Sequence, residues 1–171
     1  MSMVAEAVAG PEAGFADLAG KYLTFRLGPE EFGLAILQVR EIIGLMDITV
    51  VPRTPAWVRG VINLRGKVIP VVDLRLKFAM EAAADTPQTC VIVVEVTRND
   101  ATVLMGVVVD QVNEVRDIDA DMIDATPSFG SAVEADFILG MGKVGSTVLM
   151  LLDIHRVLST EEMVLIEQAA G

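Results

Sequence analysis

The stretch Gly60-Val-Ile-Asn-Leu-Arg-Gly-Lys-Val-Ile-Pro-Val-Val-Asp-Leu-Arg75 decides the fold class of this chain. Two segments rich in Val and Ile flank the turn residues 63–66, and this pattern predicts a β-hairpin. Asn at the first turn position and Gly at the fourth favour a type I turn with Arg65 near its tip. Pro70 removes a hydrogen-bond donor from the second strand, so we expect this strand to be an edge strand or to contain a bulge.

Other short strands are expected along the chain. Residues 21–27 alternate apolar and polar side chains, and further strands are predicted at about 89–97, 102–109 and 146–153. The segment 37–43 fits either a single helical turn or the end of a strand. Ser159-Thr-Glu-Glu162 is a capping box, which predicts a short C-terminal helix at about 160–169. Many short strands with one clear helix indicate an all-β protein built from small barrels.

The sequence also repeats itself. The segment Gly33–Glu41 is similar to Gly106–Glu114, and Gly60–Asp73 is similar to Gly140–Asp153 with the same internal spacing. We therefore infer two related β-barrel subdomains, at about 21–80 and 88–158, with a polar linker at 82–88 between them. A groove between two packed barrels is a natural docking site.

Composition limits the class of protein. Hydrophobic residues make up 53% of the 171 residues, but no apolar run approaches the roughly 20 residues of a membrane-spanning helix. A single cysteine excludes an internal disulfide framework and agrees with a reducing compartment. Residues 1–20 are rich in Ala, Gly and Glu and lack the basic and apolar regions of a secretory signal, so we expect a disordered tail.

The charge is strongly negative but unevenly distributed. A net charge of −11 disfavours nucleic acid or an anionic membrane as the main partner. Between positions 53 and 77, however, Asp73 is the one acidic residue among six basic ones. This segment could contact acidic groups of a partner, or it could be an ordinary solvated strand face.

Two motifs resemble known ligand sites but lack essential parts. Gly140-Met-Gly-Lys-Val-Gly145 matches a dinucleotide-binding pattern, yet a strand follows it where the phosphate site needs a helix, so a hairpin turn is favoured. Asp117, Asp119 and Asp121 imitate the start of a calcium loop. Met122 stands where that loop needs glycine, and Ser128 where it needs glutamate.

Catalytic and metal-binding residues are equally scarce. Cys90 precedes an apolar run and is expected to be a buried, inert thiol. His155 is the one histidine and has no cysteine at metal-ligand spacing. We therefore predict no enzymatic activity, no cofactor and no metal site.

Four segments together resemble the CheW family of bacterial chemotaxis coupling proteins, over about residues 20–168. They are Thr54-Pro-Ala-Trp-Val-Arg-Gly60 with the hairpin that follows it, Phe32–Ile42, Gly106–Val112 and Leu149–Leu158. The resemblance implies one CheW-like domain at 21–168, made of two SH3-like five-stranded barrels. It also implies a non-enzymatic adaptor that links the cytoplasmic tips of methyl-accepting chemotaxis receptors to the regulatory domain of the histidine kinase CheA.

The resemblance carries further expectations about partners and location. It implies a cytoplasmic protein associated with membrane-bound receptor arrays, with other CheW-like domains as additional neighbours and no direct membrane insertion. Two alternatives stay open. One is a coupling adaptor for a receptor system with a non-flagellar output, and the less favoured one is a nucleotide-binding protein that uses the 140–145 glycine loop.

Candidate partner-binding residues follow from the same resemblance. Arg65 matches an arginine implicated in receptor and kinase coupling. Ile36, Val39 and Glu41 match the first-subdomain part of the receptor-binding groove, and Val115 matches a position in the second subdomain.

Gly60 matches a glycine whose replacement by a bulkier residue is expected to disturb coupling, and Ala35 departs from the acidic or polar residue that the family often has. Each candidate also has a structural reading. Gly60 recurs as Gly140 in the repeat, just as Glu41 recurs as Glu114, whereas Arg65 aligns with Gly145. Because the fold does not need an arginine at this turn, we favour a functional role for Arg65.

Overall fold

The computed structural model describes residues 17–98, 100–126 and 137–157. Most of the expected N-terminal tail and all of the predicted helix at 160–169 lie outside these ranges. Residues 17–20 belong to the folded part of the chain, because Leu18 packs against a buried cluster. Among the residues described, no helix combines the length and the apolar character needed to cross a membrane.

Short strands dominate the chain. The first half contains β2 (Gly20–Leu27), β3 (Glu30–Ala35), the 3-10 turn η1 (Ile36–Gln38), β4 (Val39–Gly44), β5 (Val58–Leu64), β6 (Lys67–Asp73) and α2 (Leu74–Lys77). The second half contains β7 (Cys90–Arg98), β8 (Ala101–Val109), β9 (Gln111–Ile118), η2 (Ala120–Met122), β10 (Ile123–Asp124), β11 (Ile138–Val144), β12 (Thr147–Leu152) and α3 (Ile154–Val157). The predicted all-β class is confirmed, and segment 37–43 contains both a helical turn and a strand.

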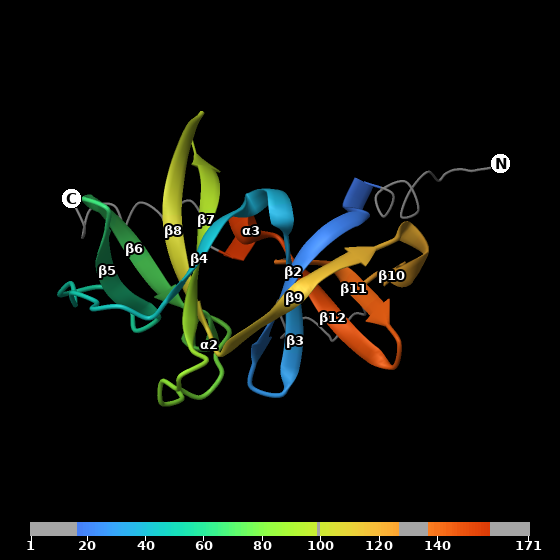
Figure 1. Ribbon diagram of the computed structural model, residues 1–171, viewed down its shortest axis with the longest axis horizontal. Coiled ribbons are helices and arrows are strands. Elements are labelled where there is room, and N and C mark those ends of the chain that lie inside the picture. The colour runs from blue at the N-terminus through green and yellow to red at the C-terminus, as the bar shows by residue number, and fades with distance from the viewer. Residues whose placement is uncertain (1–16, 99, 127–136, 158–171) are drawn as a thin grey trace.

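The strands form two sheets that lie side by side in Figure 1. The central barrel is the five-stranded sheet β4-β7-β8-β6-β5, which uses residues 39–109. The terminal barrel is the six-stranded sheet β10-β11-β12-β3-β2-β9, which joins the start of the chain to its end. If β10, only two residues long, is set aside, each barrel has the five strands of the SH3-like prediction.

The predicted repeat is present, but the predicted division at 80–88 is wrong. The first repeat (residues 20–77) and the second repeat (residues 90–157) each give their first hairpin to the sheet of the other. Thus β3 pairs in parallel with β12 through Gly33 and Leu151, and β8 pairs in the same way with β6 through Gly106 and Val71. The chain crosses between barrels at η1 and again at Asp110, so neither barrel belongs to one repeat.

This exchange places apolar residues on both faces of the inner strands. On β7, Ile92 and Val94 belong to the large cluster that fills the space between the barrels, whereas Val91 and Val93 point into the core of the central barrel. A third cluster fills the terminal barrel. The hydrophobic content of 53% is explained by these three cores, and the expected groove is filled along most of the barrel interface.

The hairpin that opened the sequence argument has a different turn from the one predicted. Leu64 pairs with Lys67, so the turn contains two residues, Arg65 and Gly66, with φ of 53° and 85°. Positive φ at both central positions is the mark of a type I′ turn, whose twist suits a two-residue hairpin. Asn63 still bonds its own turn, because its side-chain oxygen accepts a hydrogen bond from the Gly66 N–H at 2.8 Å.

Pro70 lies on β6, which is not an edge strand of its sheet, because it has β5 on one side and β8 on the other. β6 pairs with β5 along its length but with β8 only from Val71 onward. The strand is therefore locally an edge at Pro70, where a missing N–H donor costs little.

Candidate functional site

Arg65 and Glu41, two of the predicted site residues, form one ion pair. Arg65 donates from Nη1 to Oε1 of Glu41 at 2.7 Å and from Nη2 to Oε2 at 2.6 Å. Hydrogen bonds from Arg65 lower the pKa of the Glu41 carboxyl, and the same bonds raise the pKa of Arg65. The Arg65 side chain as a whole remains 69% exposed, so a partner could reach it.

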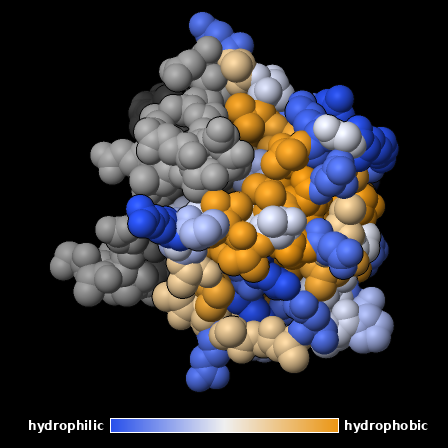
Figure 2. Space-filling model, turned by 90° about the vertical axis from the view of Figure 1, so that its left-hand side faces the viewer, coloured by the Kyte–Doolittle hydropathy of each residue, from blue (hydrophilic) through white to orange (hydrophobic). Residues whose placement is uncertain are grey.

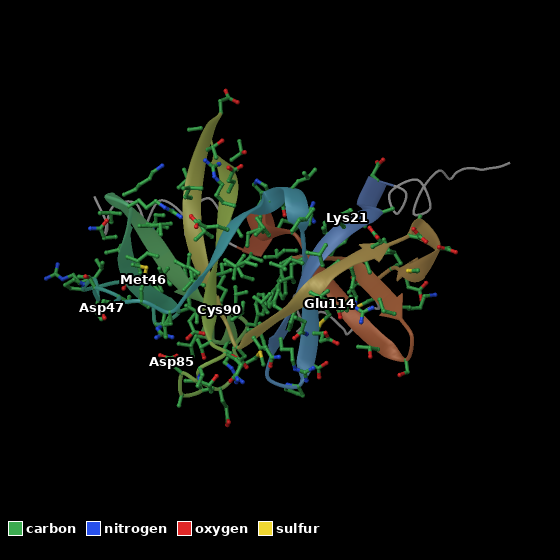
Figure 3. All side chains as sticks on the ribbon, in the orientation of Figure 1. Lys21, Met46, Asp47, Asp85, Cys90 and Glu114 are labelled. Atoms are coloured by element: carbon green, nitrogen blue, oxygen red, sulfur yellow. The ribbon has the colours of Figure 1, made fainter. Side chains whose placement is uncertain are left out.

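This pair connects the two ends of one sheet. Glu41 lies on β4 and Arg65 follows β5, and these are the two edge strands of the central barrel. Among the residues that the structure describes, the terminal barrel has no equivalent pair, because Gly145 takes the place of Arg65 and Glu114 pairs with the neighbouring Arg116 at 3.2 Å. Figure 3 places Glu114 on β9, the counterpart of β4. Closing a barrel of this kind therefore does not require the pair.

Three of the six basic residues in segment 53–77, namely Arg59, Arg65 and Arg75, pair with carboxylates of the same molecule. Arg59 lies 3.1 Å from Asp85 and 3.5 Å from Asp73. Arg75 binds both carboxylate oxygens of Asp110 at 2.6–3.0 Å. Lys77 lies 4.5 Å from the centre of the Trp57 ring. These contacts favour the interpretation of the segment as an ordinary strand face. They do not favour a broad cationic patch that binds acidic groups of a partner.

Ile36 and Val39 lie where the chain crosses from the terminal to the central barrel. Both pack against the large cluster between the barrels, as expected for residues that are partly core. Ile36 also lines a cavity of about 410 Å³. The cavity lies among residues 17–22, η1 and the start of α3, and its lining includes Leu37, which is 92% exposed, and His155. Sequence reasoning missed Leu37, although an apolar residue in a crossover turn is a usable signal.

Gly60 has a backbone role. Its φ is 140°, and a Cβ at this position would lie 2.1 Å from the carbonyl oxygen of Thr49. The Thr49 N–H donates to the Val61 carbonyl at 2.8 Å, and the Thr49 carbonyl accepts from the Val61 N–H at 2.9 Å. The neighbouring backbone therefore cannot easily move away. Coupling defects expected from larger residues at position 60 would follow from distortion of β5.

Val115 belongs to a set of exposed apolar residues that the two barrels share. It is 46% exposed on β9, and its counterpart on β4 is Ile42, which is 44% exposed. A second equivalent pair is Val68 on β6, 58% exposed, and Val148 on β12, 49% exposed. Each barrel therefore presents two outward apolar side chains at matching positions, a set that the sequence argument identified only at Val115.

The end of the central barrel is apolar over a wider area. Figure 2 shows apolar surface gathered at this end, with hydrophilic side chains along its right-hand border. Exposed apolar residues on the loop between β4 and β5 are Met46, 38% exposed, and Val50, 76% exposed. Figure 3 shows Met46 beside Asp47 on this loop. Charged and apolar groups are thus combined near the Arg65 hairpin, as is common at protein–protein contacts.

Comparison with known proteins decides the family. The family model described as the CheW-like domain matches residues 21–162. The chain belongs to the CheW-like family. Chemotaxis protein CheW of Klebsiella aerogenes is 39% identical over 150 residues, which cover 88% of each chain. Protein FrzA of Myxococcus xanthus is 31% identical over 143 residues, covering 82% of this chain and 86% of FrzA.

A solved CheW structure has the same fold. The crystal structure of the scaffolding protein TtCheW from Thermoanaerobacter tengcongensis is 30% identical, with a TM-score of 0.74, and covers 84% of this chain and 95% of that one. The protein is therefore a CheW-like chemotaxis scaffold, a non-enzymatic family. In agreement, the glycines of 140–145 lie in β11 and its hairpin turn, where Val144 pairs with Thr147 and no helix follows.

Proposed function

We propose that this CheW-like protein couples methyl-accepting chemotaxis receptors to the histidine kinase CheA. In this proposal it binds the cytoplasmic tips of the receptors and the regulatory domain of CheA within membrane-bound arrays, and it is itself cytoplasmic. An adaptor needs two surfaces that can be occupied together. The observation that carries the proposal is that each barrel exposes two apolar side chains at matching positions. They are Ile42 and Val68 on the central barrel and Val115 and Val148 on the terminal barrel.

The two surfaces present apolar residues at matching positions but differ in charge. The Arg65–Glu41 pair lies beside the surface of the central barrel, and the terminal barrel has Gly145 instead of the arginine. Charge complementarity distinguishes partners more than it adds affinity. Two related surfaces with different charge could therefore hold two different proteins, or a CheW-like domain of a neighbouring molecule.

Equivalent single substitutions test the two-surface arrangement. Val68→Asp and Val148→Asp place a charge at matching exposed positions, where the fold should tolerate it. We expect calorimetric titrations to give roughly micromolar affinity for a receptor cytoplasmic fragment and for CheA. Each variant should lose a different partner, and the wild-type protein failing to bind either one would contradict the proposal.

Arg65→Ala tests the charged part of the site. If the arginine contributes to an interfacial charge pair, binding should weaken while the melting temperature changes little. A large drop in melting temperature with binding unchanged would show that Arg65 acts only within the barrel.

A further inference from the structure

The dependence of each barrel on both repeats points to a second copy of this chain as a partner. We propose that two copies can exchange repeats, so that the first repeat of one copy assembles with the second repeat of the other. The product is a closed dimer with two complete lobes, each containing one terminal and one central barrel. This inference does not depend on the proposed coupling function.

The contacts between repeats would be the same in the monomer and the exchanged dimer. Four strand pairs join the repeats, namely β2 with β9, β3 with β12, β4 with β7 and β6 with β8. The largest buried cluster also draws side chains from both repeats, for example Phe25 and Val94. Exchange of identical elements is a low-cost route to dimers because it creates no new kind of contact.

The connection between repeats is long enough for either arrangement. Asp73, the last residue of β6, pairs with Val108, and Cys90, the first residue of β7, pairs with the adjacent Val109. The two ends of the connection are thus about 10 Å apart, two strand spacings across β8. The exposed part of the connection, the eight residues 81–88, could span roughly 25 Å when extended. The connection therefore does not force a repeat to assemble with its own partner.

The start of this connection is firmly held, because Leu74 of α2, Phe78 and Met80 pack in the largest buried cluster, so it stays with the first repeat. The exposed residues 81–88 that follow are held by fewer contacts. Arg59 holds Asp85 through a partly exposed pair at 3.1 Å, and the Glu81 carbonyl accepts a hydrogen bond from Arg75 at 3.0 Å. Figure 3 shows Asp85 on the loop below the central barrel. Exposed residues with few contacts are the part of the connection that can open for exchange.

Two full-length variants with lesions at equivalent positions test the exchange. Val71→Asp in the first repeat and Leu151→Asp in the second each place a carboxylate at a site that is 0% exposed. Neither variant should fold alone, because every lobe of a monomer or dimer would carry a lesion. When the two are unfolded in urea and refolded together at high concentration, one lobe of the exchanged dimer combines two intact repeats.

The expected result is a 1:1 heterodimer with twice the mass of the 18.3 kDa chain and about half the native near-ultraviolet signal per chain. The control mixes Val71→Asp with Leu34→Asp, two lesions in the same repeat, and should recover no native signal. Equal recovery in the control, or none in the test mixture at any concentration, would overturn the proposal.

The wild-type chain gives a second measurement that needs no lesion. Two differently tagged copies, refolded together at high concentration, should yield a dimer fraction that contains both tags and persists after dilution. Native copies mixed without unfolding should stay separate. Monomer alone at every refolding concentration would contradict the exchange.

Discussion

Arg65 is held in a backbone conformation that disfavours residues with a side chain. Its φ of 53° is in the left-handed region, and the matching position of the repeat is occupied by Gly145 with a φ of 60°. Retaining an arginine here is a cost that the hairpin itself does not require, which supports a role for the side chain. The sequence placed Arg65 correctly at the hairpin turn, and its role in binding stays a prediction. Its pairing with Glu41 could not be foreseen, because the two residues are 24 positions apart and lie at opposite edges of one sheet.

Two substitutions at this position separate the backbone from the side chain. Arg65→Ala and Arg65→Gly both remove the ion pair, and only the glycine variant relaxes the positive φ. We expect Arg65→Gly to melt about 2–4 °C above Arg65→Ala, since a cost of roughly 1 kcal/mol corresponds to a shift of this size in a chain of this length. Gly66→Ala, which adds a side chain at φ 85° in open space, should lower the melting temperature by a similar amount. An alanine variant as stable as the glycine variant would contradict the left-handed turn.

At the scale of single elements, the sequence predicted the strands better than the turns and crossovers that connect them. The apolar run Val91–Val94 is typical of a strand buried on both faces, and β7 has this environment. The turn at 63–66 was misassigned because Asn-Leu-Arg-Gly fits a four-residue type I turn as well as a two-residue turn centred on Arg65. The crossovers between barrels were not predicted, since turn signals do not tell which sheet the next strand joins.

Asp110 fixes one of these crossovers. Its carboxylate accepts hydrogen bonds from Arg75 and from the Gly28 N–H, the latter at 2.6 Å. Burial tends to raise the pKa of Asp110, but these hydrogen bonds outweigh it and hold the pKa below its usual range. The ionised carboxylate therefore stabilises the fold above the unfolded-state pKa of about 4. This contribution is lost as the pH falls through the lower folded-state pKa.

Asp110→Asn should show this pH dependence. Urea unfolding at pH 7 should give a loss of about 1–3 kcal/mol, because Arg75 keeps only a neutral partner. The difference from the wild type should shrink at pH 3, because below the unfolded-state pKa the carboxyl of the unfolded wild-type chain takes up a proton that the folded chain binds less readily. Asp117→Asn is the matched control: its pair with Lys21 is well exposed, so its effect should stay within roughly 0.5 kcal/mol. A loss that is constant from pH 7 to pH 3 would show that the carboxylate charge is not what holds the crossover.

At the scale of the whole molecule, the sequence revealed the repeat but not how the repeats assemble. Internal similarity shows that Gly60–Asp73 and Gly140–Asp153 have the same local structure. It does not show whether Val71 pairs within its own repeat or with Gly106 of the other, because both arrangements place the same residues in the same kinds of strand. Only the parallel pairing of β6 with β8 and of β12 with β3 resolves this choice.

Because each barrel contains strands of both repeats, we predict that the two barrels unfold together. The chain has one tyrosine and one tryptophan, which report on different cores. Tyr22 is buried in the core of the terminal barrel, and the Trp57 side chain packs against the cluster between the barrels. The Trp57 carbonyl also accepts a hydrogen bond from the Asp73 N–H of β6 at 2.7 Å. Tyrosine absorbance and tryptophan fluorescence should give the same thermal midpoint, because neither barrel keeps its sheet when one repeat unfolds. Calorimetry should give equal calorimetric and van't Hoff enthalpies. Two separate midpoints would mean that each barrel is stable without the other.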